Sequence, residues 1–354
     1  MKVLNFFYEN HPKFEVSYER KNQISKPNII IKGPRFCGKK TLIFNFLSQF
    51  KASEILFLDL YDTRFEKQSL ERLADFLNEN LQIKILCLYN LDFIPNLEKI
   101  KIPIILSTNI KDLNVNGFEE LELDYFDFEE FISVSKKNLP INNLVGLFLQ
   151  SGRSKFGEKN ILLRQSFTLL ELEILKYLAL NLGQQISISK IFIELKKRLK
   201  TSKDSVYQAI KKLENTYVIY TLKHDEKKLQ KIYFKDFGLR NNLCISKDFS
   251  HLFENLVLSE LFKFKEEFFY NKYFNFYSQI SKIAYISSPT LDIDLIKLRA
   301  KKILPKALEF GIFHVIFITL SSEDSFFEQG VKFEVISFDK FSLGFCKGYF
   351  KKNM

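Results

Sequence analysis

The residues best suited to chemistry in this chain lie in the segment 33–41, which reads GPRFCGKKT. Gly33 and Gly38 leave room for backbone N–H groups to wrap around a phosphate, and the Lys39 ammonium can reach the outer oxygens of that phosphate. The pattern therefore indicates a phosphate-binding loop. Its candidate contact residues are Gly33, Pro34, Arg35, Phe36, Cys37, Gly38, Lys39, Lys40 and Thr41.

The residues on either side supply the setting that such a loop needs. The apolar run NIIIK at 28–32 is typical of a buried strand, and TLIFNFLSQF at 41–50 follows a helical pattern. A helix that begins at the loop points the positive end of its dipole at a bound anion. We therefore expect a strand, the loop and a helix in that order, with a nucleotide phosphate in the loop.

One position departs from the usual pattern. The residue after the loop lysine is normally Ser or Thr, whose hydroxyl holds Mg²⁺ beside the nucleotide, but here it is Lys40. Thr41 comes next, yet one step along a helix turns a side chain by about 100°, so Thr41 should point elsewhere. A cation therefore stands where a magnesium ligand is expected.

Length and composition limit the class of protein. The chain has 354 residues, enough for roughly two or three domains. No apolar run approaches the roughly 20 residues that a membrane span requires, and no secretory segment opens the chain, so we expect a cytoplasmic protein without a membrane partner. The cysteines lack metal-ligand spacing, and we expect reduced thiols and no metal site at Cys37, Cys87, Cys244 and Cys346.

The net charge of +11 suggests an anionic partner. Part of the lysine excess reflects a composition rich in Phe, Lys, Ile and Asn and without Trp, so the distribution of charge tells more than the total. The segment 111–131 is acidic, whereas 190–235 carries the densest positive charge. We therefore expect any nucleic-acid contact in the second of these segments.

The order of strand-like and helical runs predicts three domains. Continuous apolar strands alternate with helices after residue 28, which indicates an α/β fold with a parallel sheet, and we assign 1–135 to a P-loop nucleotide-binding domain. Three amphipathic helical runs and two strands around a polar turn predict a winged helix in 136–245. The remaining residues, 246–354, read as a second, mixed α/β domain.

This order resembles a family of bacterial and archaeal AAA+-like ATPases. Members join a P-loop domain, a winged helix and a C-terminal domain of unassigned function with a restriction-endonuclease-like fold. The blocks that carry the resemblance are GPRFCGKKTLI at 33–43, LDYFDFEEFI at 123–132, KIYFKDFGLRNNL at 231–243 and HLFENLVLSEL at 251–261. The resemblance implies ATP or ADP as the ligand, but it does not carry the activity over.

The second ATPase motif tests that activity. A hydrolytic P-loop enzyme ends its third strand with Asp, which supports Mg²⁺, and often with Glu, which positions the attacking water. The matching strand ILCLYNLDFIP has Tyr89 and Asn90 at these positions, and the nearby acids are Asp92 and Asp59. The family's polar residues that sense the γ-phosphate correspond to Ser107, Thr108 and Asn109.

The C-terminal segment departs from a nuclease in a similar way. Nuclease centres of the implied fold need an acid on the first helix and further acids with a lysine on a hairpin. Glu254 takes the helix position, yet no Asp or Glu lies between Glu267 and Asp292, so we expect Glu254 to form hydrogen bonds within its domain. The candidate DNA contacts precede the third helix of the winged helix: Lys196, Lys197, Arg198, Lys200 and Lys203.

These observations predict a protein that binds ATP or ADP and whose hydrolysis is weak or lost, because Lys40, Tyr89 and Asn90 replace the residues that would seat the metal and the water. The alternative is a DNA-binding or protein-docking module with a vestigial nucleotide loop. The sequence identifies no protein partner.

Overall fold

The computed structural model describes residues 1–15, 18–135, 138–154, 166–226, 229–246, 248–290 and 292–345. Contacts within the chain divide it into two compact units. The first holds Met1–Tyr125 with Asn215–Tyr217, and the second holds Phe126–Glu214 with Val218–Met354. The three-domain division at residues 135 and 245 stays a prediction. Cys346 lies outside the described residues.

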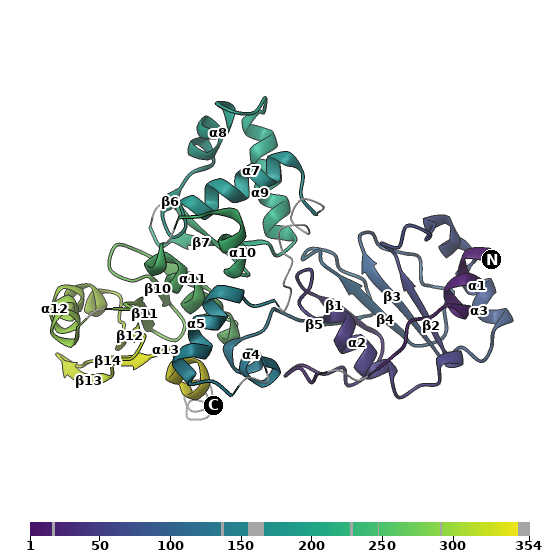
Figure 1. Ribbon diagram of the computed structural model, residues 1–354, viewed down its shortest axis with the longest axis horizontal. Helices are drawn as coiled ribbons and strands as arrows, with labels where there is room; N and C mark the ends of the chain where they lie inside the picture. Colours follow the sequence, from purple (N-terminus) through teal and green to yellow (C-terminus); the bar gives the residue numbers. More distant parts are fainter. Residues whose placement is uncertain are drawn as a thin grey trace. The chain divides into compact units, whose positions relative to one another are not determined.

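The first unit is built on a parallel sheet, which confirms the α/β fold expected for this part of the chain (Figure 1). In the described residues its five strands lie in the order β2-β3-β4-β1-β5, and every neighbouring pair is parallel. The strands are β1 (Ile29–Lys32), β2 (Ile55–Asp59), β3 (Ile85–Leu91), β4 (Ile104–Thr108) and β5 (Glu119–Glu122). The longer helices are α1 (Lys2–Glu9), α2 (Lys39–Leu47) and α3 (Leu73–Glu79).

Apolar side chains cover both faces of this sheet, as continuous apolar strands require. One core joins the inner side of α2, through Leu42, Ile43 and Leu47, to β1, β2, β3 and β4. A second core joins the other face of the sheet to α1 and α3. The carboxyl ends of the parallel strands therefore open at one edge, where the loop after β1 and the ends of β3 and β4 meet.

Strand β5 was not expected from the sequence, because three of its four residues are exposed and three are acidic. Its backbone pairs with β1 in register, Ile29 with Glu119 through Lys32 with Glu122. Ion pairs support this edge: Lys32 Nζ lies 2.6 Å from Glu120 and Lys26 Nζ lies 2.8 Å from Glu119. Hydrogen bonding and charge, and not burial, thus define the strand.

The second unit combines a helical segment with a mixed sheet. Its helices are α4 (Phe128–Ser135), α5 (Ile141–Ser151), α7 (Leu169–Leu180), α8 (Ile188–Lys196), α9 (Lys203–Asn215), α10 (Gly238–Leu243), α11 (Phe249–Leu261), α12 (Ile293–Glu309) and α13 (Phe338–Lys340). Its strands are β6 (Gln185–Ile186), β7 (Ile219–His224), β8 (Gln230–Phe234), β9 (Phe268–Tyr270), β10 (Phe276–Ser278), β11 (Ile283–Ser287), β12 (His314–Thr319), β13 (Asp324–Glu328) and β14 (Val331–Ser337).

One continuous sheet runs through this unit. Within the described ranges its order is β13-β14-β12-β11-β10-β9-β7-β8-β6. The antiparallel strands β6, β8 and β7 lie next to the helices α7, α8 and α9 in the sequence, and β7 continues into the rest of the sheet through a parallel pairing with β9. The segments predicted as a winged helix and as a second α/β domain therefore share one sheet.

The block KIYFKDFGLRNNL forms a tight joint in the second unit. The Asp236 carboxylate accepts hydrogen bonds from the backbone N–H groups of Arg153, at 2.8 Å, and Gly238, at 3.0 Å, and from Ser154 Oγ at 2.7 Å. A Cβ at Gly238 would lie 2.4 Å from the Cα of Gly152, so glycine is required where these two backbones meet.

Among the helices that the structure describes, none combines the length and the apolar character that a membrane span needs.

Candidate phosphate-binding site

The loop 33–38 lies between β1 and the first turn of α2, as the sequence predicted. Gly38 takes the position before the helix with φ of 98°, a left-handed conformation that glycine adopts without strain. Phe36 also has a positive φ, 64°, and its side chain is 44% exposed. The loop therefore turns sharply and leads directly into the N-terminal end of α2, the end that favours an anion.

Lys39 is the central cation of this loop. Its side chain is buried, and its ammonium donates hydrogen bonds of 2.6 Å to the carbonyl oxygens of Gly33 and Pro34. Burial lowers the pKa of Lys39, and the nearby Arg35 guanidinium acts in the same direction. Phosphate oxygens accept the same N–H donors more strongly than neutral carbonyls do, so a phosphate can replace these internal partners.

Arg20 is a residue of this site that sequence reasoning missed. Its buried guanidinium donates to the carbonyl oxygen of Cys37 in the loop and, at 2.9 Å, to that of Asp124. A Cβ at Gly38 would lie 3.0 Å from Arg20 Nη1. The segment before β1 therefore fixes the outer side of the loop. The glycine–lysine pattern contains no signal for this, because the contact joins residues 17 positions apart.

The positions expected to support a metal hold an aromatic ring and an amide. The Tyr89 ring stacks on Phe57, with centroids 5.9 Å apart and planes at 29°, and burial raises its pKa. Asn90 has a φ of 62° and donates from Nδ2 to Asp59 Oδ1 at 2.8 Å. The same Asp59 oxygen accepts the backbone N–H of Tyr61 at 3.1 Å. Asp59 therefore holds a turn at the end of β2.

Lys40 points toward the same aromatic group. Its ammonium lies 5.4 Å from the centroid of the Phe44 ring and 5.8 Å from that of Phe57, and the side chain is exposed. Phe14 completes the group, 5.1 Å from Phe44 and 6.2 Å from Phe57. Aromatic rings and a lysine thus occupy the side of α2 where the family pattern places a hydroxyl and a carboxylate.

These residues do not fit a magnesium ion, which needs oxygen ligands in near-octahedral geometry. Asp92, the acid two positions beyond Asn90, forms an ion pair with Lys67 at 3.0 Å. Within the described ranges, no group of three or more His, Cys, Asp or Glu side chains could hold a metal ion. Of residues 40, 89 and 90, Lys40 offers a phosphate a positive charge, and none of the three offers a metal ion a carboxylate.

The sensor candidates lie on β4 and just after it, with different surroundings. Thr108 Oγ1 donates to the Leu91 carbonyl at 2.7 Å, and Asn109 Oδ1 accepts from the Tyr61 hydroxyl at 3.4 Å. Ser107 is fully buried, pairs with Ile31 across the sheet, and its hydroxyl has no hydrogen-bond partner among the residues that the structure describes. Among these three described residues, Ser107 is thus the one with a buried side-chain oxygen that has no hydrogen-bond partner.

Glu254 on α11 forms hydrogen bonds within its unit, as predicted. Its Oε1 accepts from Lys231 Nζ at 2.9 Å and from the Tyr233 hydroxyl, both on β8. Both hydrogen bonds engage the same carboxylate oxygen. The acid predicted at a nuclease position thus fastens α11 to the sheet.

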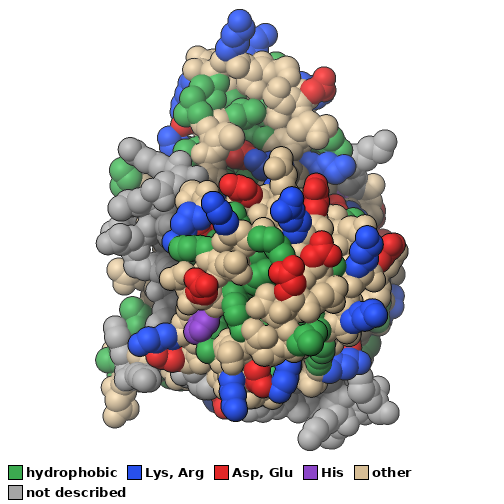
Figure 2. All heavy atoms as spheres, turned by 90° about the vertical axis from the view of Figure 1, so that its right-hand side faces the viewer, with side chains coloured by type: hydrophobic (Ala, Val, Ile, Leu, Met, Phe, Trp, Pro, Cys, Tyr) green, Lys and Arg blue, Asp and Glu red, His purple; other side chains and the backbone are tan. Residues whose placement is uncertain are grey.

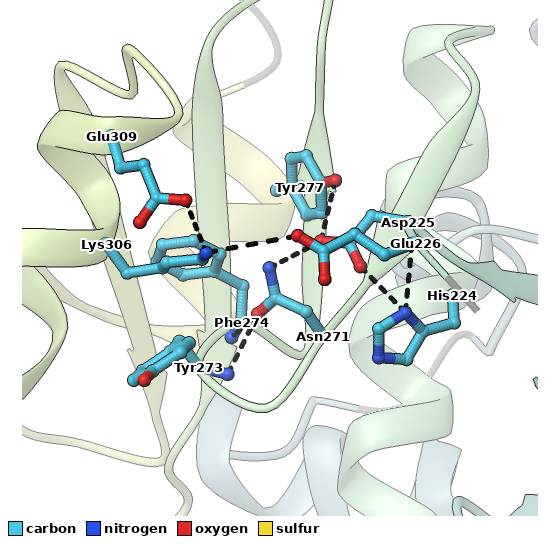
Figure 3. A network of polar contacts seen from close by, with 9 residues as sticks. All are labelled: His224, Asp225, Glu226, Asn271, Tyr273, Phe274, Tyr277, Lys306 and Glu309. Carbon is cyan, nitrogen blue, oxygen red and sulfur yellow. Dashed lines mark hydrogen bonds and ion pairs between the residues drawn. The ribbon is translucent and has the colours of Figure 1, made fainter.

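A buried acid that the sequence did not single out lies at the end of β7 (Figure 3). Asp225 Oδ2 accepts from Asn271 Nδ2 at 2.8 Å and from the Tyr277 hydroxyl at 3.1 Å, and its Oδ1 lies 2.7 Å from Nδ1 of His224. Burial, and then this carboxylate, raises the pKa of Tyr277. The cluster joins the β7–β8 hairpin to β10, a contact between residues 52 positions apart.

The basic candidates all lie exposed around the turn between α8 and α9. They are Lys196, Lys197, Arg198, Lys200 and Lys203. Lys197 pairs with Glu194 at 2.6 Å, and the Ser202 hydroxyl accepts the Ser205 N–H at 3.0 Å in the first turn of α9. Lysine and arginine side chains are visible at the top of Figure 2.

No protein-family model matches the chain, and no curated protein matches it. Solved structures are similar to parts of it, and three of them follow. The Walker-type ATPase paby2304 of Pyrococcus abyssi is 13% identical over 61% of this chain and 90% of its own, with a TM-score of 0.41. The Orc1 protein of Aeropyrum pernix, solved in complex with DNA, is 11% identical over 68% and 91%, with a TM-score of 0.36.

The third similar structure is DnaA of Aquifex aeolicus bound to AMPPCP. It is 13% identical to this chain, covers 60% of it and 86% of its own length, and has a TM-score of 0.27. All three TM-scores lie below 0.5, so these similarities do not by themselves establish an activity for this chain.

Proposed function

We propose that the first unit binds an adenine nucleotide, ATP or ADP, as an AAA+-like P-loop protein in which hydrolysis is weak or lost. The observation that carries this proposal is the loop itself. It runs from a buried parallel strand into the N-terminal end of α2, with the Lys39 ammonium held 2.6 Å from two carbonyl oxygens of the loop. Backbone donors, a lysine and a helix dipole converge there, as phosphate binding requires.

The order of the strands supports the AAA+-like part of the proposal. Strand β4 lies between β1, which precedes the loop, and β3, which ends in Tyr89 and Asn90. The loop and the carboxyl ends of β3 and β4 thus lie at the same edge of the sheet. Ser107 and Asn109, at the end of β4, therefore belong to the same unit as a nucleotide bound in the loop. We assign Ser107, Thr108 and Asn109 to contacts with the outer phosphate.

The weak hydrolysis follows from the second motif. Phosphoryl transfer needs a metal to bridge the outer phosphates and an acid or amide to position water. Tyr89 is stacked on Phe57 and Asn90 is bonded to Asp59, so neither is placed to seat a magnesium ion or a water molecule. Nucleotide would then bias the conformation of the chain without being consumed rapidly.

The test compares binding of a fluorescent ATP analogue by the full chain and by Lys39→Ala. We expect the variant to bind at least tenfold more weakly, about 1.4 kcal/mol. Lys101→Ala is the matched control, because Lys101 is exposed just before β4, at the opposite edge of the sheet from the loop. Equal binding by Lys39→Ala and the unmodified chain would refute the proposal, and rapid Mg²⁺-dependent phosphate release lost in Lys39→Ala would refute its second half.

A second function, DNA binding, is favoured by one observation: the five basic side chains around the α8–α9 turn are all exposed. We propose that α7, α8 and α9 with the strands β6, β7 and β8 form a winged helix that contacts DNA. We also propose that residues 246–354 have a restriction-endonuclease-like fold without nuclease activity, and that the protein is cytoplasmic.

DNA contact made through lysine side chains should show little sequence preference and should weaken steeply with salt. Absence of binding to duplex DNA at low salt would remove this function.

A further inference from the structure

The side chains on the side of α2 next to the loop disfavour the binding of a divalent cation. The exposed Lys40 ammonium lies over the Phe44 and Phe57 rings, and Tyr89 stacks on the same Phe57. We propose that the loop binds the phosphates of its nucleotide as a free anion, without magnesium, and that Lys40 supplies the positive charge that the metal would otherwise bring. This inference rests on the proposed nucleotide site.

The first argument concerns charge. Arg20, Lys39 and Lys40 place three cations at or beside the loop. Of the acids at the ends of β2 and β3, Asp59 accepts a hydrogen bond from Asn90 and Asp92 pairs with Lys67. A divalent ion between these groups would face repulsion from the ammonium groups of Lys39 and Lys40. Free ATP or ADP carries more negative charge than its magnesium complex, so the same cations favour the uncomplexed nucleotide.

The second argument concerns reach. The Lys40 side chain leaves the first turn of α2 at the position where the loop pattern places the metal-binding hydroxyl. Its ammonium sits on a flexible four-carbon stem, and within the described part of the chain it makes weak attractive contacts with the Phe44 and Phe57 ring faces. An anion in the loop offers a stronger partner than a ring face, so the ammonium can leave Phe44 for a phosphate oxygen.

The third argument concerns the surroundings of Tyr89, which stands where an acid that supports the metal is expected. A magnesium ion held by nucleotide phosphates still needs support from oxygen ligands on the protein. Tyr89 belongs to an aromatic group with Phe14, Phe44 and Phe57, which offers a metal no carboxylate. Hydrated magnesium binds poorly against such a surface, because its waters would lose hydrogen-bond partners.

The experiment measures the affinity of the full chain for ATP and ADP by calorimetry, once with excess Mg²⁺ and once with EDTA. We expect binding in EDTA to be as tight as in Mg²⁺ or tighter. Lys40→Met keeps the length and the apolar stem of the side chain but removes its charge. In EDTA its affinity for the nucleotide should be at least about fivefold lower than that of the unmodified chain, whereas the affinity of Lys40→Arg should stay within about twofold. Lys101→Met is the control for loss of an exposed lysine.

The outcomes separate this inference from the nucleotide site on which it rests. Binding in Mg²⁺ that is lost in EDTA overturns the inference and leaves the proposed nucleotide site standing. Unchanged binding by Lys40→Met in EDTA overturns the role of Lys40. No binding in either buffer refutes the nucleotide site itself. Far-UV circular dichroism of each variant establishes that a loss of binding is not a loss of fold.

Discussion

Gly33 offers the sharpest test of how the loop is built. A Cβ at this position would lie 2.0 Å from the carbonyl oxygen of Leu123, whereas an ordinary carbon–oxygen contact is about 3.3 Å or more. The obstacle is backbone, so the segment after β5 would have to move by roughly 1.3 Å in Gly33→Ala. The Leu123 N–H donates to the Lys32 carbonyl at 2.8 Å, and such a movement breaks that bond.

The expected cost follows from these two effects. Overpacking of a tight contact costs about 1–3 kcal/mol, and a lost backbone hydrogen bond about 1 kcal/mol. Gly33→Ala should therefore destabilise the pairing of β1 with β5 by about 2–4 kcal/mol. Hydrogen exchange in peptides that cover 29–33 and 119–124 should then be roughly 30- to 700-fold faster, because each 1.4 kcal/mol is a factor of ten.

The matched control is Gly146→Ala on the exposed side of α5. A Cβ there meets nothing within 4 Å, and alanine is favoured over glycine in a helix by about 0.5–1 kcal/mol. This variant should leave exchange in the β1 and β5 peptides unchanged. If Gly33→Ala also leaves it unchanged within about threefold, the close approach of the two backbones is wrong. The measurement needs no nucleotide, so it tests the fold separately from the proposed ligand.

Two further outcomes are expected in the second unit. Hydrogen bonds from His314 and Lys332 lower the pKa of Glu334 from 4.5 to about 2, so its contribution to stability is present above pH 4.5 and lost as the pH falls toward 2. Glu334→Gln should cost about 1–2 kcal/mol in urea unfolding at pH 7 and much less near pH 3; a cost that does not change with pH would contradict this. Gly238→Ala should destabilise the joint with Gly152 by about 2–3 kcal/mol, since its Cβ would lie 2.4 Å from a backbone Cα, and an unchanged melting temperature would count against that contact.

The central strands and the loop could be predicted because their signals are local. Strands β1 to β4 are buried on both faces and read as continuous apolar runs, and the glycines and lysine of the loop lie within one short segment. Strand β5 escaped because its residues are acidic and exposed, and only its pairing with β1 reveals it. An edge strand held by hydrogen bonds and ion pairs leaves no periodic apolar pattern to find.

The residues that the sequence did not single out, in the phosphate site and in the second unit, could not be predicted because their partners lie far along the chain. Arg20 reaches the Cys37 carbonyl, and Asp225 reaches Tyr277, through the folded backbone alone. The sequence did identify residues 40, 89 and 90 as departures from the magnesium pattern. What fills their place, an aromatic group that includes Phe57, depends on how β2, β3 and α2 pack.

The blocks that carry the family resemblance and the positions that would carry hydrolysis serve different purposes in this structure. Asp236 in KIYFKDFGLRNNL accepts hydrogen bonds from residues 153, 154 and 238, and Glu260 in HLFENLVLSEL accepts the N–H of Phe128 at 3.0 Å. Replacing either would leave buried donors without partners, at a cost of about 1–3 kcal/mol each. These residues therefore stabilise the fold, whether or not the chain turns over nucleotide. Lys40 and Tyr89 belong to no such joint: each contacts aromatic rings beside the loop, and each could differ without breaking the sheet. Resemblance across the blocks is thus a statement about the fold, and the chemistry must be decided at residues 40, 89 and 90.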